Sequence, residues 1–215
     1  MINYNNYVLT NEEKAILMGG LLGDERIVRR GESYRYRVHH SLDQKEYVDW
    51  KRSKLSNICQ TTQPPRQVPK KGTSYILYEF YTSSGKYLKE LHELFYKKNE
   101  KGQFKRTINQ DLIDNLPVDP LILAVWFLDD GSVRNDCYAG KIATQGFSRE
   151  ESELLCDYLR KFNVDCRTVM HTAKSQQWYI TIPARTFGNL MKLIEPFVKE
   201  IPSMEYKLNE LRRTL

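Results

Sequence analysis

The segment that decides the fold is Leu121-Ile122-Leu123-Ala124-Val125-Trp126-Phe127-Leu128-Asp129-Asp130-Gly131, an apolar run that ends in two carboxylates and a glycine. A run of about ten residues is too short to cross a bilayer and is typical of a buried helix. Gly131 is expected to follow the last helical turn in a left-handed conformation. Asp129 and Asp130 then lie at the negative end of the helix dipole, where acids cost stability. A bound cation is the simplest compensation.

A second segment of the same design lies near the N-terminus. Residues 15–22 are apolar apart from glycines, and the acid Asp24 follows them. Gly19 and Gly23 are four residues apart and share one helix face, so another backbone could approach closely there. Two acid-ended helices about half a chain apart indicate a duplicated unit.

The elements expected around the two helices repeat in the same order, which is helix, two strands, helix, two strands, helix. The alternation over residues 34–40 places Arg35, Arg37 and His39 on one face of a strand. Asp24 precedes His40 by sixteen residues, and Asp130 precedes Gln145 by fifteen. The predicted fold class is therefore α+β, with two pseudo-symmetric αββαββα halves, antiparallel saddle-shaped sheets and two central packed helices.

The predicted division of the chain is an N-terminal half over residues 1–100, a linker over 101–116 and a C-terminal half over 117–215. The linker prediction depends on the polar, basic composition of residues 97–106. Residues 107–116 could instead pack on the second half.

The composition is that of an ordinary globular protein. Of 215 residues, 40% are hydrophobic and 28% are charged, which argues against disorder. The net charge of +6 permits nucleic-acid binding without requiring it. The four cysteines show no CxxC spacing, so zinc and a disulfide scaffold are disfavoured and a reducing setting is favoured. Without a signal peptide or a membrane-length apolar run, we expect an intracellular protein of a bacterial cytoplasm or an organelle, with no membrane partner.

The two helix-terminal acids predict a metal site. If the helices pack side by side, Asp24 and Asp130 emerge together between two sheets, and their repulsion favours a bridging cation. Oxygen ligands without nearby His or Cys favour Mg²⁺, which suits hydrolysis of a phosphodiester. Two basic sheets beside this centre could follow duplex DNA over roughly 20 bp, about one helical turn for each sheet.

Two nine-residue stretches, Leu17 to Glu25 and Leu123 to Gly131, resemble the two copies of the motif that names the LAGLIDADG homing endonucleases, in the single-chain, double-motif form. The resemblance covers nearly the whole chain. It includes the segments Thr144 to Ser148 with Glu151, and Ile201-Pro202 followed by Tyr206-Lys207-Leu208.

The resemblance implies roles for particular residues. Asp24 and Asp130 fall on the metal-binding acid of the motif, and Gly23 and Asp129 fall on the preceding position, whose backbone carbonyl can also bind metal. The other catalytic positions are two basic residues near the scissile phosphate, Lys207 and Arg106 (with Lys105 as the rival of Arg106), and two solvent-positioning residues, Gln145 and His40. Glu25 departs from the motif, which ends in glycine. Such asymmetry between the halves suggests an asymmetric target, or one weaker site.

The sequence thus predicts a monomeric, site-specific homing endonuclease that makes double-strand breaks in a long DNA target. Mg²⁺ is the expected cofactor, with Mn²⁺ as a substitute and Ca²⁺ supporting binding without cleavage. The residues expected to contact DNA are Arg29, Arg35 and Arg37, then Arg66, Lys70 and Lys71 in a basic turn, and Arg134, Lys141, Arg167, Lys174 and Tyr179 in the second half.

Three alternatives differ in function. One is an RNA-binding intron-splicing factor (a maturase) on the same fold, with intron RNA as partner. Asp24, Asp130 and Lys207 argue against it, because an RNA binder has no need of such acids. A DNA-binding regulator would more often have lost one acid. An intein is disfavoured because no splicing blocks flank the motifs. Finally, both apolar runs could be plain core helices, but that leaves the paired acids and the repeat unexplained.

Overall fold

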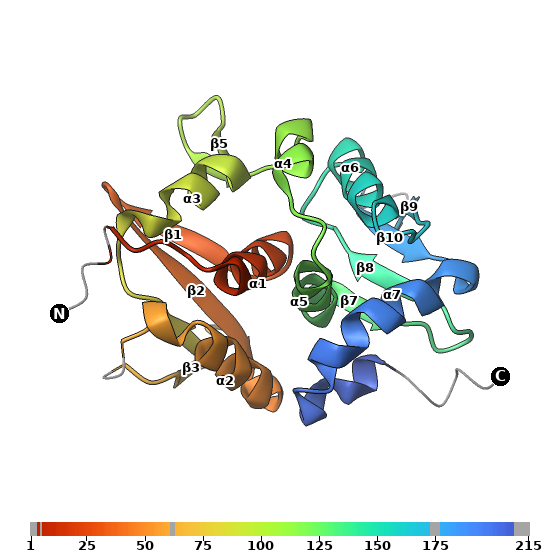
Figure 1. Cartoon of the computed structure of the whole chain (residues 1–215), viewed down its shortest axis with the longest axis horizontal. Coiled ribbons are helices and arrows are strands. Elements are labelled where there is room, and N and C mark those ends of the chain that lie inside the picture. The colour runs from red at the N-terminus through yellow and green to blue at the C-terminus, as the bar shows by residue number, and fades with distance from the viewer. Residues whose placement is uncertain (1–3, 5, 61–62, 173–176, 209–215) are drawn as a thin grey trace.

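The computed structural model describes residues 4, 6–60, 63–172 and 177–208, and it shows two similar halves joined at the centre (Figure 1). The first half contains α1 (Asn11–Leu22), β1 (Arg26–Arg30), β2 (Ser33–Ser41), α2 (Lys45–Lys54), β3 (Arg66–Pro69), β4 (Ile76–Tyr81) and α3 (Lys89–Phe95). The second half contains α5 (Pro120–Asp130), β7 (Gly131–Val133), β8 (Gly140–Ala143), α6 (Arg149–Arg160), β9 (Arg167–Met170), β10 (Trp178–Ile182) and α7 (Ala184–Val198). Short 3-10 turns are η1 (Leu42–Gln44), η2 (Ser56–Ile58), η3 (Lys86–Leu88) and η4 (Pro202–Lys207).

The two sheets have the same topology. Their strand orders are β1-β2-β4-β3 and β7-β8-β10-β9, and every pairing is antiparallel. Each half therefore runs helix, two strands, helix, two strands, helix. The predicted α+β class with two pseudo-symmetric halves is confirmed.

The segment between the halves carries regular structure of its own. A hairpin of β5 (Tyr96–Lys98) and β6 (Phe104–Arg106) follows α3, and α4 (Gln110–Asn115) follows the hairpin. The predicted linker, residues 101–116, thus includes β6 and α4. Buried Leu112 and Ile113 attach α4 to the core.

The long strand β2 shows why each sheet has one apolar and one polar face. Tyr34, Tyr36 and Val38 are buried, whereas the alternate residues Arg35 and Arg37 are only half-buried. The strand period of two assigns successive side chains to opposite faces, so the predicted basic face is confirmed.

The central helices α1 and α5 pack side by side between the two sheets (Figure 1). A Cβ atom added at Gly19 would lie 2.7 Å from the Cβ of Val125, and one at Gly23 would lie 2.5 Å from Oδ2 of Asp129. Both distances are too short for real carbon contacts, so the predicted close approach at these glycines is confirmed. Within the described part of the chain, no helix is both long and apolar enough to cross a membrane.

Two local predictions were wrong. Gly131 is extended, with φ −79° and ψ 151°, because it begins β7 directly after α5. It excludes a side chain for a steric reason instead, since a Cβ there would lie 2.3 Å from the Phe127 ring. Arg66 begins the edge strand β3 and is not part of a turn, whereas Lys70 and Lys71 do lie in the β3–β4 connection.

Candidate active site between the central helices

The ends of α1 and α5 deliver three acids to one place. Helix α1 ends at Leu22, and the N–H of Gly23 still donates to the Gly19 carbonyl before the chain turns into Asp24. Asp129 and Asp130 form the last turn of α5. The side chain of Asp24 is 50% exposed, so this acid is more open to solvent than a buried helix end implied.

The carboxylates at the two helix ends disfavour ionisation. Burial, followed by the charges of Asp24 and Asp129, raises the pKa of Asp130 to about 8. Burial and the Asp129 charge likewise raise the pKa of Asp24. The Asp130 carboxylate forms no hydrogen bond or ion pair with any residue that the structure describes. An unpaired oxygen donor beside two other acids is the environment that a hard divalent cation stabilises.

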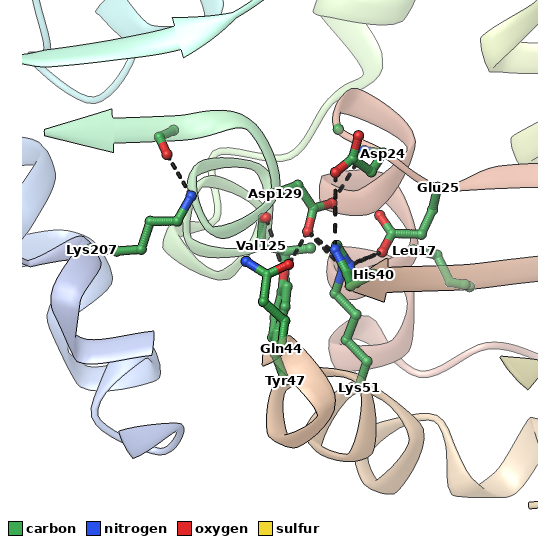
Figure 2. A network of polar contacts seen from close by, with 12 residues as sticks. Leu17, Asp24, Glu25, His40, Gln44, Tyr47, Lys51, Val125, Asp129 and Lys207 are labelled. Atoms are coloured by element: carbon green, nitrogen blue, oxygen red, sulfur yellow. Dashed lines mark hydrogen bonds and ion pairs between the residues drawn. The ribbon is translucent and has the colours of Figure 1, made fainter. Parts of the chain in front are cut away.

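Asp129 has a different environment, because its side chain crosses into the first half (Figure 2). Its Oδ1 accepts hydrogen bonds from Tyr47 Oη and Lys51 Nζ, both at 2.8 Å. Its Oδ2 faces the backbone N–H of Asp24 at 3.4 Å. Gly23 makes this crossing possible, since any side chain there would occupy the space of the carboxylate.

Lys51, Glu25 and His40 complete a buried polar cluster around Asp129 (Figure 2). Lys51 Nζ donates to Glu25 Oε1, and His40 Nε2 lies 3.0 Å from the same oxygen. Burial and the Lys51 charge lower the pKa of His40 to about 4. His40 Nδ1 lies 4.0 Å from Asp24 Oδ2, so the predicted solvent-positioning residue is beside the first acid but buried.

Lys51 and Tyr47 were not predicted as site residues, although the sequence contained two indications. Lys51 follows Tyr47 by four residues and so shares the buried face of an amphipathic helix, where a lysine is out of place. Glu25 stands where the motif has glycine. In the fold, Lys51 and Glu25, each unusual at its own position in the sequence, form an ion pair with one another.

The two predicted basic residues lie close to the helix ends. Arg106 Nη1 donates to the carbonyls of Leu21, Gly23 and Glu25 at 2.8, 2.6 and 3.1 Å, so it caps the C-terminal end of α1. Its rival Lys105 is exposed on β6. Lys207, buried on η4, donates to the Gly131 carbonyl at 2.6 Å, and burial lowers its pKa. Each basic residue therefore caps one of the two central segments.

A cavity of about 330 Å³ opens beside the second acid. Asp130 and Gln145 line it together with Lys141 and Tyr179 of the second sheet. The structure thus brings the predicted solvent-positioning Gln145 to the same space as Asp130. Lys141 Nζ lies 5.3 Å from the centre of the Tyr179 ring.

The residues predicted to bind DNA differ in how free their charges are. Arg37 and Arg66 both pair with the buried Glu79, at 2.6 and 2.9 Å, and Arg35 lies over the Tyr81 ring. Two more of these arginines form ion pairs, Arg29 with Glu32 and Arg134 with Asp136. Lys70, Lys71 and Arg167 are exposed. Lys174 lies outside the described residues.

Comparisons with known proteins match the chain to an endonuclease family and to relatives named either as endonucleases or as RecA proteins. A model of the LAGLIDADG DNA endonuclease family matches residues 14–190. The chain is 30% identical to Protein RecA of Mycobacterium gastri, over 94% of the chain and 48% of that protein, so it spans about half the length of this curated relative. It is 25% identical to DNA endonuclease I-ChuI of Chlamydomonas applanata, over 94% of the chain and 96% of that protein. The structure of the homing endonuclease I-WcaI bound to its DNA recognition sequence has the same fold, with a TM-score of 0.80, 24% identity and coverage of 95% of this chain and 90% of that one.

Proposed function

The chain belongs to the LAGLIDADG DNA endonuclease family, and we propose that it is a homing endonuclease that makes site-specific double-strand breaks in a long, asymmetric DNA target. The observation that carries this proposal is the pair Asp24 and Asp130, which the two central helices bring to one end of their interface. Both acids have raised pKa values. The Asp130 carboxylate forms no hydrogen bond or ion pair with a described residue.

Divalent metal fits this donor set, and we propose Mg²⁺ with Asp24 and Asp130 as its ligands. The backbone carbonyls of Gly23 and Asp129 are further candidates, although the former already accepts from Arg106. When bound, the ion would polarise the scissile phosphate and lower the pKa of a coordinated water. Asp129 is proposed to contribute no side-chain oxygen, because Lys51 and Tyr47 occupy its Oδ1 and the Asp24 backbone N–H faces its Oδ2.

The protein groups around the acids have separable roles in this proposal. Gln145, in the cavity with Asp130, would orient the attacking water by hydrogen bonding. Lys207 and Arg106 would hold positive charge near the reacting phosphate while they fix the ends of the two central segments. Because each already donates to backbone carbonyls, their positions are set before DNA arrives, which lowers the reorganisation needed during the reaction.

The basic faces of the two sheets are the proposed DNA-binding surface. In the first sheet Glu79 holds the guanidinium groups of Arg37 and Arg66 in place. In the second sheet, Lys141 and Tyr179 lie beside the Asp130 cavity. The differing side chains on the two sheets fit a target whose half-sites differ. One chain supplies both acids, so we propose a monomer, organised as an N-terminal half, a connecting segment at 101–116 and a C-terminal half.

The test is selection of duplexes from a randomised library by binding in Ca²⁺, followed by transfer of the selected duplexes to Mg²⁺. The expected result is a double-strand break at one position, absent from the Asp24→Asn and Asp130→Asn variants, which should still bind in Ca²⁺. If wild-type protein cuts no selected duplex but binds a structured RNA tightly, the endonuclease proposal is wrong and RNA binding replaces it.

A further inference from the structure

A lysine ammonium group lies completely inside the protein, where three possible metal ligands converge. The side chain of Lys51 has no exposed surface, and its Nζ contacts Glu25 Oε1, Asp129 Oδ1 and His40 Nε2 (Figure 2). One ligand atom each of Glu25, His40 and Asp129 lie within 4.8 Å of one another. A carboxylate pair with an imidazole is a donor set that transition-metal ions bind readily.

The charge balance shows what Lys51 does there. Glu25 and Asp129 place two carboxylates side by side, and negative charge on them is costly to bury without a cation. Burial, followed by the Glu25 charge, raises the pKa of Asp129 to about 7. Burial alone would lower the pKa of Lys51, but the charges of Asp129 and Glu25 raise it above its ordinary value. Lys51 therefore remains an ammonium ion. Its nitrogen lies at hydrogen-bond distance from Asp129 and His40, 2.8 and 3.2 Å away, and fills the space where a metal ion would have to sit.

Lys51 also connects to the catalytic acid of the first half. It fixes Oδ1 of Asp129, whose Oδ2 faces the backbone N–H of Asp24. The contact crosses the interface of the central helices, where Gly23 leaves the necessary space. In the second motif Asp129 occupies the position that Gly23 occupies in the first, so this connection exists on one side only.

We propose that Lys51 is a positioning residue, a built-in cation that keeps divalent ions out of the Glu25–His40–Asp129 group and fixes Asp129 against the backbone that carries Asp24. Divalent ions are thereby confined to the Asp24–Asp130 side of the interface. The positioning part rests on the proposed endonuclease function. The exclusion of metal does not, so the two parts have separate tests.

The metal-exclusion test uses Co²⁺ as the probe, because its visible absorption reports coordination by an imidazole nitrogen. The background is Asp24→Asn/Asp130→Asn, which removes the proposed catalytic ligands. With Lys51 present, we expect no absorption band from bound cobalt. Adding Lys51→Met should create a one-equivalent site, which a further His40→Ala change should abolish. Lys54→Met, the same change one turn along α2 on a lysine that pairs with Glu12 and Glu200, is the matched control and should create none.

A cobalt band in the background that keeps Lys51 would overturn the exclusion, and this measurement stands even if the Lys51→Met variant fails to fold. A folded Lys51→Met variant without a new site would overturn it too, because something other than the lysine would then exclude the ion.

The positioning test separates geometry from stability. Above the raised pKa of Asp129, which is about 7, the two carboxylates and the ammonium sum to a charge of −1. Under that condition Lys51→Met makes the sum −2, whereas Lys51→Met/Glu25→Gln restores −1. We expect the double variant to regain most of the thermal stability that the single variant loses. Its kcat should nevertheless stay at least tenfold below wild type, with unchanged DNA affinity in Ca²⁺, because Asp129 still lacks its anchor.

A double variant with wild-type stability and wild-type kcat would show that Lys51 only balances charge. If wild-type protein cuts no DNA at all, the proposed function fails, and the cobalt measurement alone decides whether Lys51 excludes metal.

Discussion

Replacing Asp130 by asparagine should make the protein more stable and abolish its activity, and the size of the first effect depends on pH. The pKa of Asp130 is raised from 3.8 to about 8 by burial and by the charges of Asp24 and Asp129. The folded state therefore keeps a proton that the unfolded state releases above about pH 4. Stability must fall as the pH rises from about 4 to about 8, and an amide removes this penalty.

The magnitude follows from the two pKa values. At pH 7 the free-energy cost of keeping Asp130 protonated in the folded state is set by the difference between pH 7 and the ordinary pKa of 3.8, about 3 pH units. At about 1.4 kcal/mol per unit, this cost is at most roughly 4 kcal/mol. Asp130 is partly open to solvent, so screening reduces this to about 2 kcal/mol. For a chain of this length, that corresponds to a Tm about 4–8 °C higher for Asp130→Asn at pH 7, and to almost no difference at pH 4.

The assay is thermal unfolding of wild type and Asp130→Asn in EDTA at pH 4, 5.5 and 7, with Asp114→Asn, an exposed acid on α4, as control. Cleavage in Mg²⁺ should fall by about 100-fold or more in Asp130→Asn, while DNA binding in Ca²⁺ persists. A lower Tm at pH 7, or loss of DNA binding together with cleavage, would show that Asp130 is a structural residue and would refute the reasoning.

Three further variants test other parts of the site. Gly23→Ala should lower the free energy of unfolding by about 1–3 kcal/mol, because its Cβ would lie 2.5 Å from Asp129 Oδ2. Thermal unfolding measures this loss. The control Gly188→Ala, with nothing within 4 Å of its Cβ, should not destabilise the protein. Lys207→Met should lower the single-turnover cleavage rate by about 100-fold without weakening DNA binding in Ca²⁺. An unchanged rate would contradict the proposed role of Lys207 beside the reacting phosphate. Lys141→Ala should weaken DNA binding and reduce the slope of the logarithm of the binding constant against the logarithm of salt concentration by about 1. The control Lys89→Ala on α3 should leave this slope unchanged. Equal slopes for Lys141→Ala and wild type would show that Lys141 does not contact the phosphates.

Much of the fold was predictable because local patterns dictate it. The period of two along β2, the capping residue Thr10 before α1 and the box of Ser148 with Glu151 before α6 each depend on residues close in the chain. The conformation of Gly131 was predicted wrongly because a glycine can be required either by a left-handed φ or by a lack of space for a side chain, and the sequence does not distinguish the two. Only the position of the Phe127 ring distinguishes them.

The paired acids could be predicted for the same reason, since each one ends an apolar run. The cluster around Lys51 could not, because its members come from the turn after α1, from β2, from α2 and from α5. Their separate anomalies are visible in the sequence, but nothing local says that Lys51 and Glu25 meet. Buried charge pairs between distant segments are fixed by tertiary packing, and their partners emerge only with the fold.

The two halves share a topology but not an electrostatic design, and this difference constrains how the catalytic acids can act. Asp24 lies beside His40 and Asp129, and the ion pair of Lys51 with Asp129 holds that carboxylate against the backbone N–H of Asp24 before any metal or DNA binds. Asp130 instead borders a cavity with Gln145, and its carboxylate forms no hydrogen bond or ion pair with a described residue. The backbone that carries Asp24 is therefore preorganised, whereas Asp130 needs a cation to become charged at neutral pH. Divalent metal should accordingly order the Asp130 side more than the Asp24 side. The strand whose cleavage relies on Asp130 should then show the steeper dependence on pH and on metal concentration.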